Sequence, residues 1–324
     1  MATAAITEIL APVRDGLAAV EARLRQADAG QHQVLTLATE QLLLAGGKRI
    51  RPAITLLTAG LWDAPTPRTI ALAAAVEMLH TATLVHDDLI DGALLRRGIP
   101  TLNATWLPNA TVLTGDYLFA RAAGLAAETD NPHVLRLFAQ TLMTIVNGEI
   151  GQCFSSRGLV SRSDYEQRIY AKTGALFVLS AEAAAILHGA DGPSLEAVCT
   201  FGRQVGMAYQ IVDDILDFSA DAAQIGKPVG GDLRQGLVTL PTLLHLEAYP
   251  DDADVRSAIR GNGVDPATAE RAVARVRASG ALGQAAAEAR RYVERGRQAL
   301  ERFSASVYRE SLTALSAYMV DRKL

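Results

Sequence analysis

The spacing of apolar residues is the feature that most constrains how this chain can fold. Apolar side chains recur at three- and four-residue intervals along almost its whole length, and alternating runs of β-branched residues are scarce. This period predicts amphipathic helices and not strands. We therefore expect an all-α fold, a single-domain helical bundle of about ten helices over residues 1–324. The expected helices lie near residues 5–27, 31–45, 49–61, 67–90, 109–128, 132–156, 164–188, 194–219, 232–248 and 266 to the end, with Asn131 as an N-cap before Pro132.

Composition excludes several classes of function. Hydrophobic residues make up 49% of the chain and charged residues 20%, with a formal net charge of −4, so wholesale nucleic-acid binding is not expected. The two cysteines, Cys153 and Cys199, lack metal-site spacing and are expected to be reduced thiols of a cytoplasmic protein. No secretory signal is expected. The apolar stretch Thr69–Val85 contains Glu77 and His80, which favours a buried core helix over a transmembrane segment.

Two acidic motifs stand far apart in the sequence. Residues 86–98 read HDDLIDGALLRRG and residues 213–217 read DDILD. In a helix, the three aspartates of each motif share one face, where they repel one another unless a divalent cation is present. Ligands that are all oxygen favour Mg²⁺, which also binds substrate phosphates. A solvated acidic face is the alternative, but each triad directly follows apolar residues. The candidate metal and catalytic residues are Asp87, Asp88, Asp91, Asp213, Asp214 and Asp217.

With these motifs, the sequence resembles the trans-type isoprenyl diphosphate synthase (polyprenyl synthetase) family from about Gly46 to Pro241. The resemblance implies one polyprenyl synthetase domain, with the isoprenoid synthase fold around a deep central cavity and the two motifs facing each other across its mouth. It implies a prenyltransferase that uses about three Mg²⁺ ions, held by Asp87, Asp91 and Asp213. The implied substrates are isopentenyl diphosphate and an allylic diphosphate such as farnesyl or geranylgeranyl diphosphate. Family members are usually homodimers.

The segment Gly46-Gly47-Lys48-Arg49-Ile50-Arg51-Pro52 is a compact basic turn. Two glycines end one helix and Pro52 stands in the first turn of the next, so Lys48 and Arg51 can converge on an anion at that helix start. Taken alone, the segment is better explained as a helix boundary with unrelated positive charge. The resemblance to the family signature GGKRxRP implies that Lys48 and Arg51 bind isopentenyl diphosphate, whereas Arg49 is assigned no contact.

The resemblance assigns further substrate-binding positions. His80 and Arg97 match residues that bind isopentenyl diphosphate, although a lone histidine in an apolar helix is more often a core residue. Arg96, Lys172 and Thr173 match residues that bind the allylic diphosphate, and Lys172 is also assigned a catalytic role. Lys172 and Thr173 precede an apolar run, so the alternative interpretation of this pair is a capped helix start. Gln210, Lys227 and Asp232 match the pattern as well. Leu237 replaces a lysine that many members have, so we expect somewhat weaker binding of the allylic diphosphate.

Residues before the first aspartate motif bear on product length. In the family, a bulky aromatic residue four or five positions before this motif stops elongation early, but here those positions are Thr83 and Ala82. We therefore expect a medium- or long-chain product, hexaprenyl to decaprenyl diphosphate, and expect Ala82→Phe to shorten it. Geranylgeranyl diphosphate is the alternative product if Met78 or another helix forms a deeper floor.

Three rival classes share some of these features. A terpene cyclase would have a different second metal motif and no GGKRxRP turn, and a head-to-head synthase would have asymmetric motifs. A non-catalytic subunit of a heteromeric synthase typically loses aspartates, whereas both triads are intact here. The basic end of the chain, Tyr318 to Lys323, is expected to be a surface tail.

Overall fold

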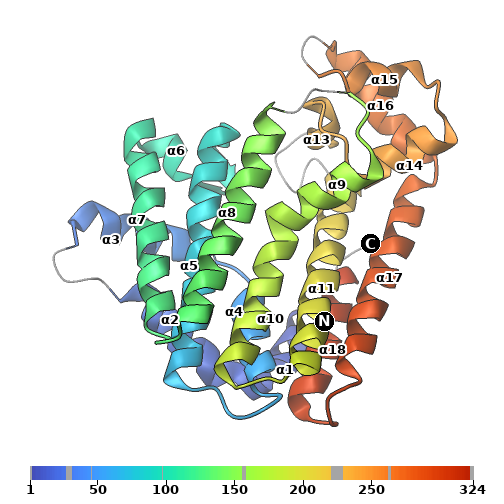
Figure 1. Ribbon diagram of the computed structural model, residues 1–324. Helices are drawn as coiled ribbons and strands as arrows, with labels where there is room; N and C mark the ends of the chain where they lie inside the picture. The colour runs from blue at the N-terminus through green and yellow to red at the C-terminus, as the bar shows by residue number, and fades with distance from the viewer. Residues whose placement is uncertain are drawn as a thin grey trace. The chain divides into compact units, whose positions relative to one another are not determined.

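The computed structural model describes residues 2–26, 31–44, 46–96, 98–154, 158–219, 229–261 and 264–321. Coiled ribbons make up nearly all of this described chain (Figure 1). The sheet in the described residues pairs two two-residue strands antiparallel, β1 (Leu95–Arg96) and β2 (Ile99–Pro100), with Leu95 opposite Pro100. The predicted all-α class is therefore confirmed.

The helices follow in chain order. They are α1 (Ala2–Ile9), η1 (Ala11–Val13), α2 (Arg14–Arg25), α3 (Gln33–Leu44), α4 (Ile50–Ala59), α5 (Pro67–Ile90), α6 (Leu102–Thr105), α7 (Pro108–Ala127), α8 (Pro132–Phe154), α9 (Arg162–Ile169), the π-helical turn η2 (Tyr170–Gly174), α10 (Ala175–Leu187), α11 (Gly192–Ser219), α13 (Gly231–Arg234), α14 (Leu240–Ala248), α15 (Ala253–Ala258), α16 (Pro266–Ala278), α17 (Ala281–Leu300) and α18 (Val307–Val320).

These elements form two compact units, which are described separately. Unit 1 comprises Met1–Thr141, Leu176–Cys199 and Leu300–Leu315, and unit 2 comprises Leu142–Ala175, Thr200–Ala299 and Ser316–Leu324. The first aspartate motif belongs to unit 1 and the second to unit 2.

Helix α5 is the centre of unit 1 and packs against α7, α4 and α2. It begins after a reciprocal capping box of Thr66 and Thr69, with Pro67 in its first turn, where a missing N–H leaves no hydrogen bond unmade. Residues 71–79, rich in alanine, are all buried, so neighbouring helices can approach closely. The helix ends at Asp91, followed by Gly92 with φ of +61°, a conformation that favours glycine. The last turn of α5 therefore bears the first aspartate motif.

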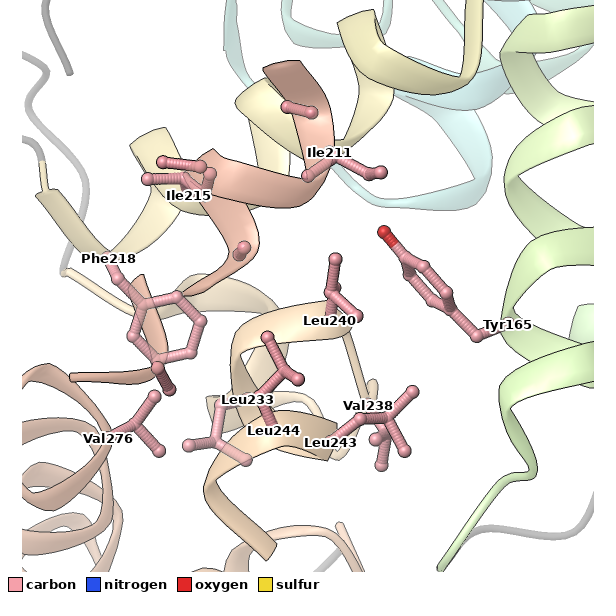
Figure 2. Close-up of a cluster of buried hydrophobic side chains, with 14 of the residues drawn as sticks. Tyr165, Ile211, Ile215, Phe218, Leu233, Val238, Leu240, Leu243, Leu244 and Val276 are labelled. Atoms are coloured by element: carbon pink, nitrogen blue, oxygen red, sulfur yellow. The ribbon is translucent and has the colours of Figure 1, made fainter. Parts of the chain in front are cut away.

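Unit 2 has its own hydrophobic core. Tyr165 of α9 lies against residues of α11, α13, α14 and α16, and several of these side chains converge in one cluster (Figure 2). The labelled members are Tyr165, Ile211, Ile215, Phe218, Leu233, Val238, Leu240, Leu243, Leu244 and Val276. This core fixes the part of α11 that bears the second aspartate motif.

Several predicted boundaries are confirmed and others are wrong. Helix 67–90 agrees at both ends, and Asn131 Oδ1 accepts from the backbone N of His133 (3.0 Å) as the predicted N-cap. The expected helix 232–248 is divided at Gly236, whose φ is +80° and where a Cβ would lie 2.7 Å from Gly261 Cα. The expected helix from residue 266 is three helices, with the first break at Gly280 (φ +79°). The range 5–27 is likewise divided, at Pro12.

Two helical stretches, Pro67–Ile90 and Arg162–Leu187, are long and apolar enough to cross a membrane by length and composition alone. In the most apolar windows of these stretches, however, 67% and 72% of the residues are buried inside the structure. Both stretches therefore have the surroundings of core helices.

Candidate active site

The first aspartate motif divides into one buried and two accessible carboxylates. Asp88 is only 5% exposed, and the Arg96 guanidinium donates to both of its oxygens at 2.8–3.0 Å. The tight turn between α5 and the β1–β2 hairpin returns Arg96 to this position, with the backbone N of Ala93 donating to the Asp88 carbonyl (2.8 Å). Asp87 is half-buried and Asp91 is exposed. Asp88 therefore anchors the motif, whereas Asp87 and Asp91 keep surface that is accessible to solvent.

His86, directly before this triad, is a residue that sequence reasoning missed. Its Nε2 lies 3.1 Å from the Val112 carbonyl oxygen, and its ring centroid is 5.2 Å from that of Phe119. A Cβ on Gly115 would lie 2.2 Å from the same Nε2. Gly115 on α7 therefore makes room for the imidazole that fixes the end of α5. A lone glycine inside a helical pattern was the only available signal.

The second motif also has a buried middle carboxylate. Asp214 is 3% exposed, and its two oxygens accept from the Tyr165 hydroxyl (2.7 Å) and the Gln210 side-chain amide (3.0 Å). Burial raises the pKa of Asp214 to about 6, while these two hydrogen bonds act in the opposite direction. Asp213 is half-buried. The middle aspartate is again held by the protein itself.

Asp217, the last residue of the second triad, fastens the segment that follows. Its carboxylate accepts from the backbone N of Gly231 and of Asp232, both at 3.1 Å, at the start of α13. Burial, together with the charges of Asp217 and Asp214, raises the pKa of Asp232, and the positive charges of Lys172 and Arg168 oppose this shift. Sequence comparison had matched Asp232 to the family pattern without a role.

Lys172 and Thr173 do not begin a helix, contrary to the sequence-based interpretation. They lie in the π-helical turn η2, which interrupts a continuous helical stretch from Arg162 to Leu187. Single π turns inside helices occur frequently at functional sites. Lys172 is exposed, and the buried Thr173 donates from its hydroxyl to Gln210 Oε1 (2.6 Å). Two substrate-binding candidates, Thr173 and Gln210, are therefore joined by a hydrogen bond between their side chains.

The basic turn separates into residues with different roles. Arg49 has φ of +47° and forms ion pairs with Glu21 and with Glu77, whose Oε1 lies 3.0 Å from Arg49 Nη1. Burial alone lowers the pKa of Arg49, but the hydrogen bonds and charges of the two glutamates outweigh it and hold the pKa above its ordinary value. Lys48 is exposed, and Arg51 is buried with its guanidinium carbon 5.0 Å from the Phe177 ring centroid. Arg49 is thus structural, in agreement with its lack of an assigned contact.

Comparison with known proteins decides the family. The model of the polyprenyl synthetase family matches residues 32–276. The chain belongs to this family. It is similar to heptaprenyl diphosphate synthase component 2 of Geobacillus stearothermophilus (39% identity over 311 residues, 95% of this chain and 96% of the relative). It is also similar to the all-trans-nonaprenyl-diphosphate synthase (geranyl-diphosphate specific) of Rhodobacter capsulatus (38% identity, 97% of each chain).

Solved structures agree with this polyprenyl synthetase assignment. The polyprenyl synthase from Caulobacter crescentus CB15, complexed with calcium and isoprenyl diphosphate, superposes with a TM-score of 0.91 at 34% identity and covers 98% of each chain. The decaprenyl diphosphate synthase from Rhodobacter capsulatus gives a TM-score of 0.90 at 33% identity, covering 98% of this chain and 99% of the other. The isoprenoid synthase fold implied by the motifs is therefore confirmed.

The remaining candidates of this polyprenyl synthetase differ in accessibility. Met78 and Ala82 are completely buried, whereas Thr83 is half-buried and donates to the His80 carbonyl oxygen (2.8 Å). Of the two small residues before the motif, Thr83 therefore has surface that a cavity could use. His80 itself is half-buried, and Leu237 is half-buried between α13 and α14. Arg97 and Lys227 lie outside the described residues, as does part of the basic end of the chain.

The donor set of this polyprenyl synthetase fits magnesium. Among the described residues, no group of three or more His, Cys, Asp or Glu side chains could hold a metal ion by itself. Mg²⁺ is usually bound by one or two carboxylates together with substrate phosphates and water, so a complete protein cage is not required. Asp87 and Asp91, one helical turn apart, offer such a partial set in unit 1, and Asp213 offers a carboxylate in unit 2.

Proposed function

We propose that this chain is a trans-prenyltransferase that condenses isopentenyl diphosphate with an allylic diphosphate and releases a medium- or long-chain polyprenyl diphosphate. In each aspartate triad the middle carboxylate is held by the protein, while Asp87, Asp91 and Asp213 keep exposed surface, and this difference carries the proposal. Relatives named as heptaprenyl, nonaprenyl and decaprenyl diphosphate synthases support the longer product over geranylgeranyl diphosphate. Each chain is proposed to be a single polyprenyl synthetase domain located in the cytoplasm.

In the proposed reaction, the allylic carbon–oxygen bond breaks, and the double bond of isopentenyl diphosphate attacks the resulting cation. Loss of a proton then gives the longer allylic diphosphate. Magnesium bound at Asp87, Asp91 and Asp213 would supply positive charge to the leaving diphosphate. Lys172 and Thr173 at the π turn hold the allylic diphosphate, helped by Arg96 and Lys227. Guanidinium groups suit phosphate oxygens because their planar donors match them.

Isopentenyl diphosphate is assigned to Lys48, Arg51, His80 and Arg97. The apolar residues before Asp87 exclude water, which would otherwise quench the cation. The function requires both aspartate motifs to border one substrate-binding cavity, as the family resemblance implies. Gln210 acts through its bonds to Thr173 and Asp214.

The test is an elongation assay with the purified chain. Radiolabelled isopentenyl diphosphate is incubated with farnesyl or geranylgeranyl diphosphate, with Mg²⁺ or with a chelator, and the products are sized by chromatography. We expect Mg²⁺-dependent products of hexaprenyl to decaprenyl length, and loss of product in Asp213→Ala. A single geranylgeranyl product would favour the alternative synthase, and a cyclic hydrocarbon would favour a terpene cyclase.

We also propose a homodimer. Large apolar side chains at helical spacing on α8, namely Met143, Val146, Ile150 and Phe154, are exposed, which is typical of a surface that a partner covers. Light scattering of the purified chain should give twice the monomer mass. Two relatives are named as component 2 of a heptaprenyl diphosphate synthase. A chain that stays monomeric and inactive by itself would therefore point to a heteromeric synthase.

A further inference from the structure

Tyr165 on α9 makes an unusual contact for a core tyrosine. Its side chain is 1% exposed and its ring packs in the hydrophobic cluster of unit 2, with the phenol oxygen directed to the side where Ile211 lies (Figure 2). The hydroxyl donates to Asp214 Oδ2 at 2.7 Å. A buried tyrosine normally finds some hydrogen-bond partner. Here the partner is the middle carboxylate of the second aspartate motif, so the bond joins α9 to α11 at the site.

The same carboxylate belongs to a longer hydrogen-bond chain. Asp214 Oδ1 accepts from Gln210 Nε2 at 3.0 Å, and Gln210 Oε1 accepts from the Thr173 hydroxyl at 2.6 Å. The direction of the chain is determined by chemistry, because a carboxylate can only accept and the amide oxygen can only accept. Thr173, Gln210, Asp214 and Tyr165 therefore form one connected series within unit 2.

This series links the two parts of unit 2 that carry substrate-binding candidates. Thr173 stands in the π turn beside Lys172, and Asp214 stands beside Asp213 on α11. Asp214 is 3% exposed, so its carboxylate depends on protein donors in place of water. Removing the Tyr165 hydroxyl or the Gln210 amide leaves a desolvated oxygen on Asp214, which can regain a partner only if the side chain or the helix moves.

We propose that Tyr165 is a positioning residue of the active site: its hydroxyl holds Asp214, and thereby Asp213 and the Lys172 turn, in the arrangement that binds metal and diphosphate. This inference rests on the proposed function. Tyr165 itself touches no substrate. Partners that orient a metal-binding group from behind typically matter about 10- to 100-fold in metal affinity or activity.

The test is Tyr165→Phe, which removes one oxygen and retains the ring. We expect kcat per folded enzyme to fall about tenfold, and the Mg²⁺ concentration for half-maximal rate to rise about tenfold. The KM for isopentenyl diphosphate should change less than about threefold, because Lys48, Arg51 and His80 belong to unit 1, whereas the four side chains of the series belong to unit 2. A second readout avoids turnover: Mn²⁺ binding in the presence of inorganic pyrophosphate, followed by electron paramagnetic resonance, should weaken similarly.

A matched control is Tyr292→Phe. Tyr292 is partly buried on α17, and its hydroxyl lies 3.4 Å from Glu166 Oε1, next to Tyr165 on the same helix. This substitution removes the same atom from the same residue type without touching the Asp214 series. It should leave kcat, the metal requirement and Mn²⁺ binding as in the wild type.

A double-mutant cycle identifies the path of the effect. If Tyr165 acts through Asp214, then Tyr165→Phe should cause much less further loss in an Asp214→Asn background than in the wild type. Two results would overturn the inference: Tyr165→Phe with wild-type kcat and Mn²⁺ binding, or a lower melting temperature with kcat per folded enzyme and Mn²⁺ binding unchanged. An inactive wild type that binds Mn²⁺ with pyrophosphate would instead reject the proposed reaction and leave the binding test of Tyr165 intact.

Discussion

Gly115→Ala is expected to damage the first aspartate motif although it adds only one methyl group. In the wild type, His86 occupies the space beside Gly115, and an added Cβ would lie 2.2, 2.5 and 2.8 Å from Nε2, Cδ2 and Cε1 of its ring. Ordinary contact begins at 3.4 Å, so the ring, whose side chain is 22% exposed, must move away from Gly115 by about 1.2 Å. That movement breaks the hydrogen bond to the Val112 carbonyl oxygen.

The magnitude follows from this displacement. Overpacking of a core position costs about 1–3 kcal/mol, and a lost hydrogen bond adds about 0.5–1.5 kcal/mol. Replacing glycine in a helix recovers about 1 kcal/mol, so the net destabilisation is about 1–3 kcal/mol. Because His86 precedes Asp87, we also expect kcat to fall about ten- to a hundredfold, the effect of an error of about 1 Å in an active site.

Gly124→Ala on the same helix is the matched control. Nothing lies within 4 Å of a Cβ at Gly124, so this variant should be as stable as the wild type or slightly more stable. In thermal melts, Gly115→Ala should unfold about 3–6 °C below Gly124→Ala, and truncation of the ring in Gly115→Ala/His86→Ala should remove most of that difference. Equal melting temperatures and equal kcat for the two glycine variants would refute the reasoning.

Further predictions concern stability, product length and pH. Arg49→Met leaves Glu77, 5% exposed, without its guanidinium; thermal melting should show a loss of about 3–5 kcal/mol, and an unchanged melting temperature would contradict the structural role. Thr83→Phe should shorten the product, as we expect for Ala82→Phe, and Ala82→Phe should in addition lower stability by about 1–3 kcal/mol because Ala82 is completely buried. Chromatography that finds wild-type products for Thr83→Phe would exclude Thr83 from the cavity wall. Burial lowers the pKa of His188 from its ordinary value of 6.5, so between the two pKa values the unfolded state binds more protons than the folded state. The contribution of His188 to stability is therefore complete above pH 6.5 and is lost as pH falls through the folded-state pKa. In thermal melts between pH 5 and 7, the melting temperature of His188→Gln should depend less on pH than that of the wild type.

Much of the fold followed from local pattern. The 67–90 helix could be predicted to the residue because Thr66 and Pro67 mark its start and a glycine follows its end. The breaks inside the expected C-terminal helix could not, because alanine, arginine and glutamate fit a helix anywhere, and only packing shows where the chain turns. The π turn at Lys172 could not be predicted either, because one extra residue within a helix does not change the spacing of an apolar run in a recognisable way.

The six aspartates show why the site was only half predictable. Helical spacing places three carboxylates on one face and treats them as equivalent. In the structure the three carboxylates of a motif differ in burial: Asp88 and Asp214 are at most 5% exposed, whereas the outer carboxylates have more exposed surface. Two of the partners that cause this difference lie beyond the helical turn that bears the aspartates: Arg96 is 8 residues from Asp88, and Tyr165 is 49 residues from Asp214. These two contacts depend on a hairpin and on the packing of two helices, and the motif sequence predicts neither.

Burial then assigns roles that residue type cannot. A carboxylate with both oxygens engaged by protein donors gains little from a metal ion, because binding would require those donors to be released. A half-exposed carboxylate exchanges water for the ion and its phosphates at much lower cost. The same reasoning separates Arg49, held by two glutamates, from the exposed Lys48 in one basic turn. In both motifs, therefore, the buried middle carboxylate maintains the shape of the site, whereas Asp87, Asp91 and Asp213 are the carboxylates that we propose to bind metal.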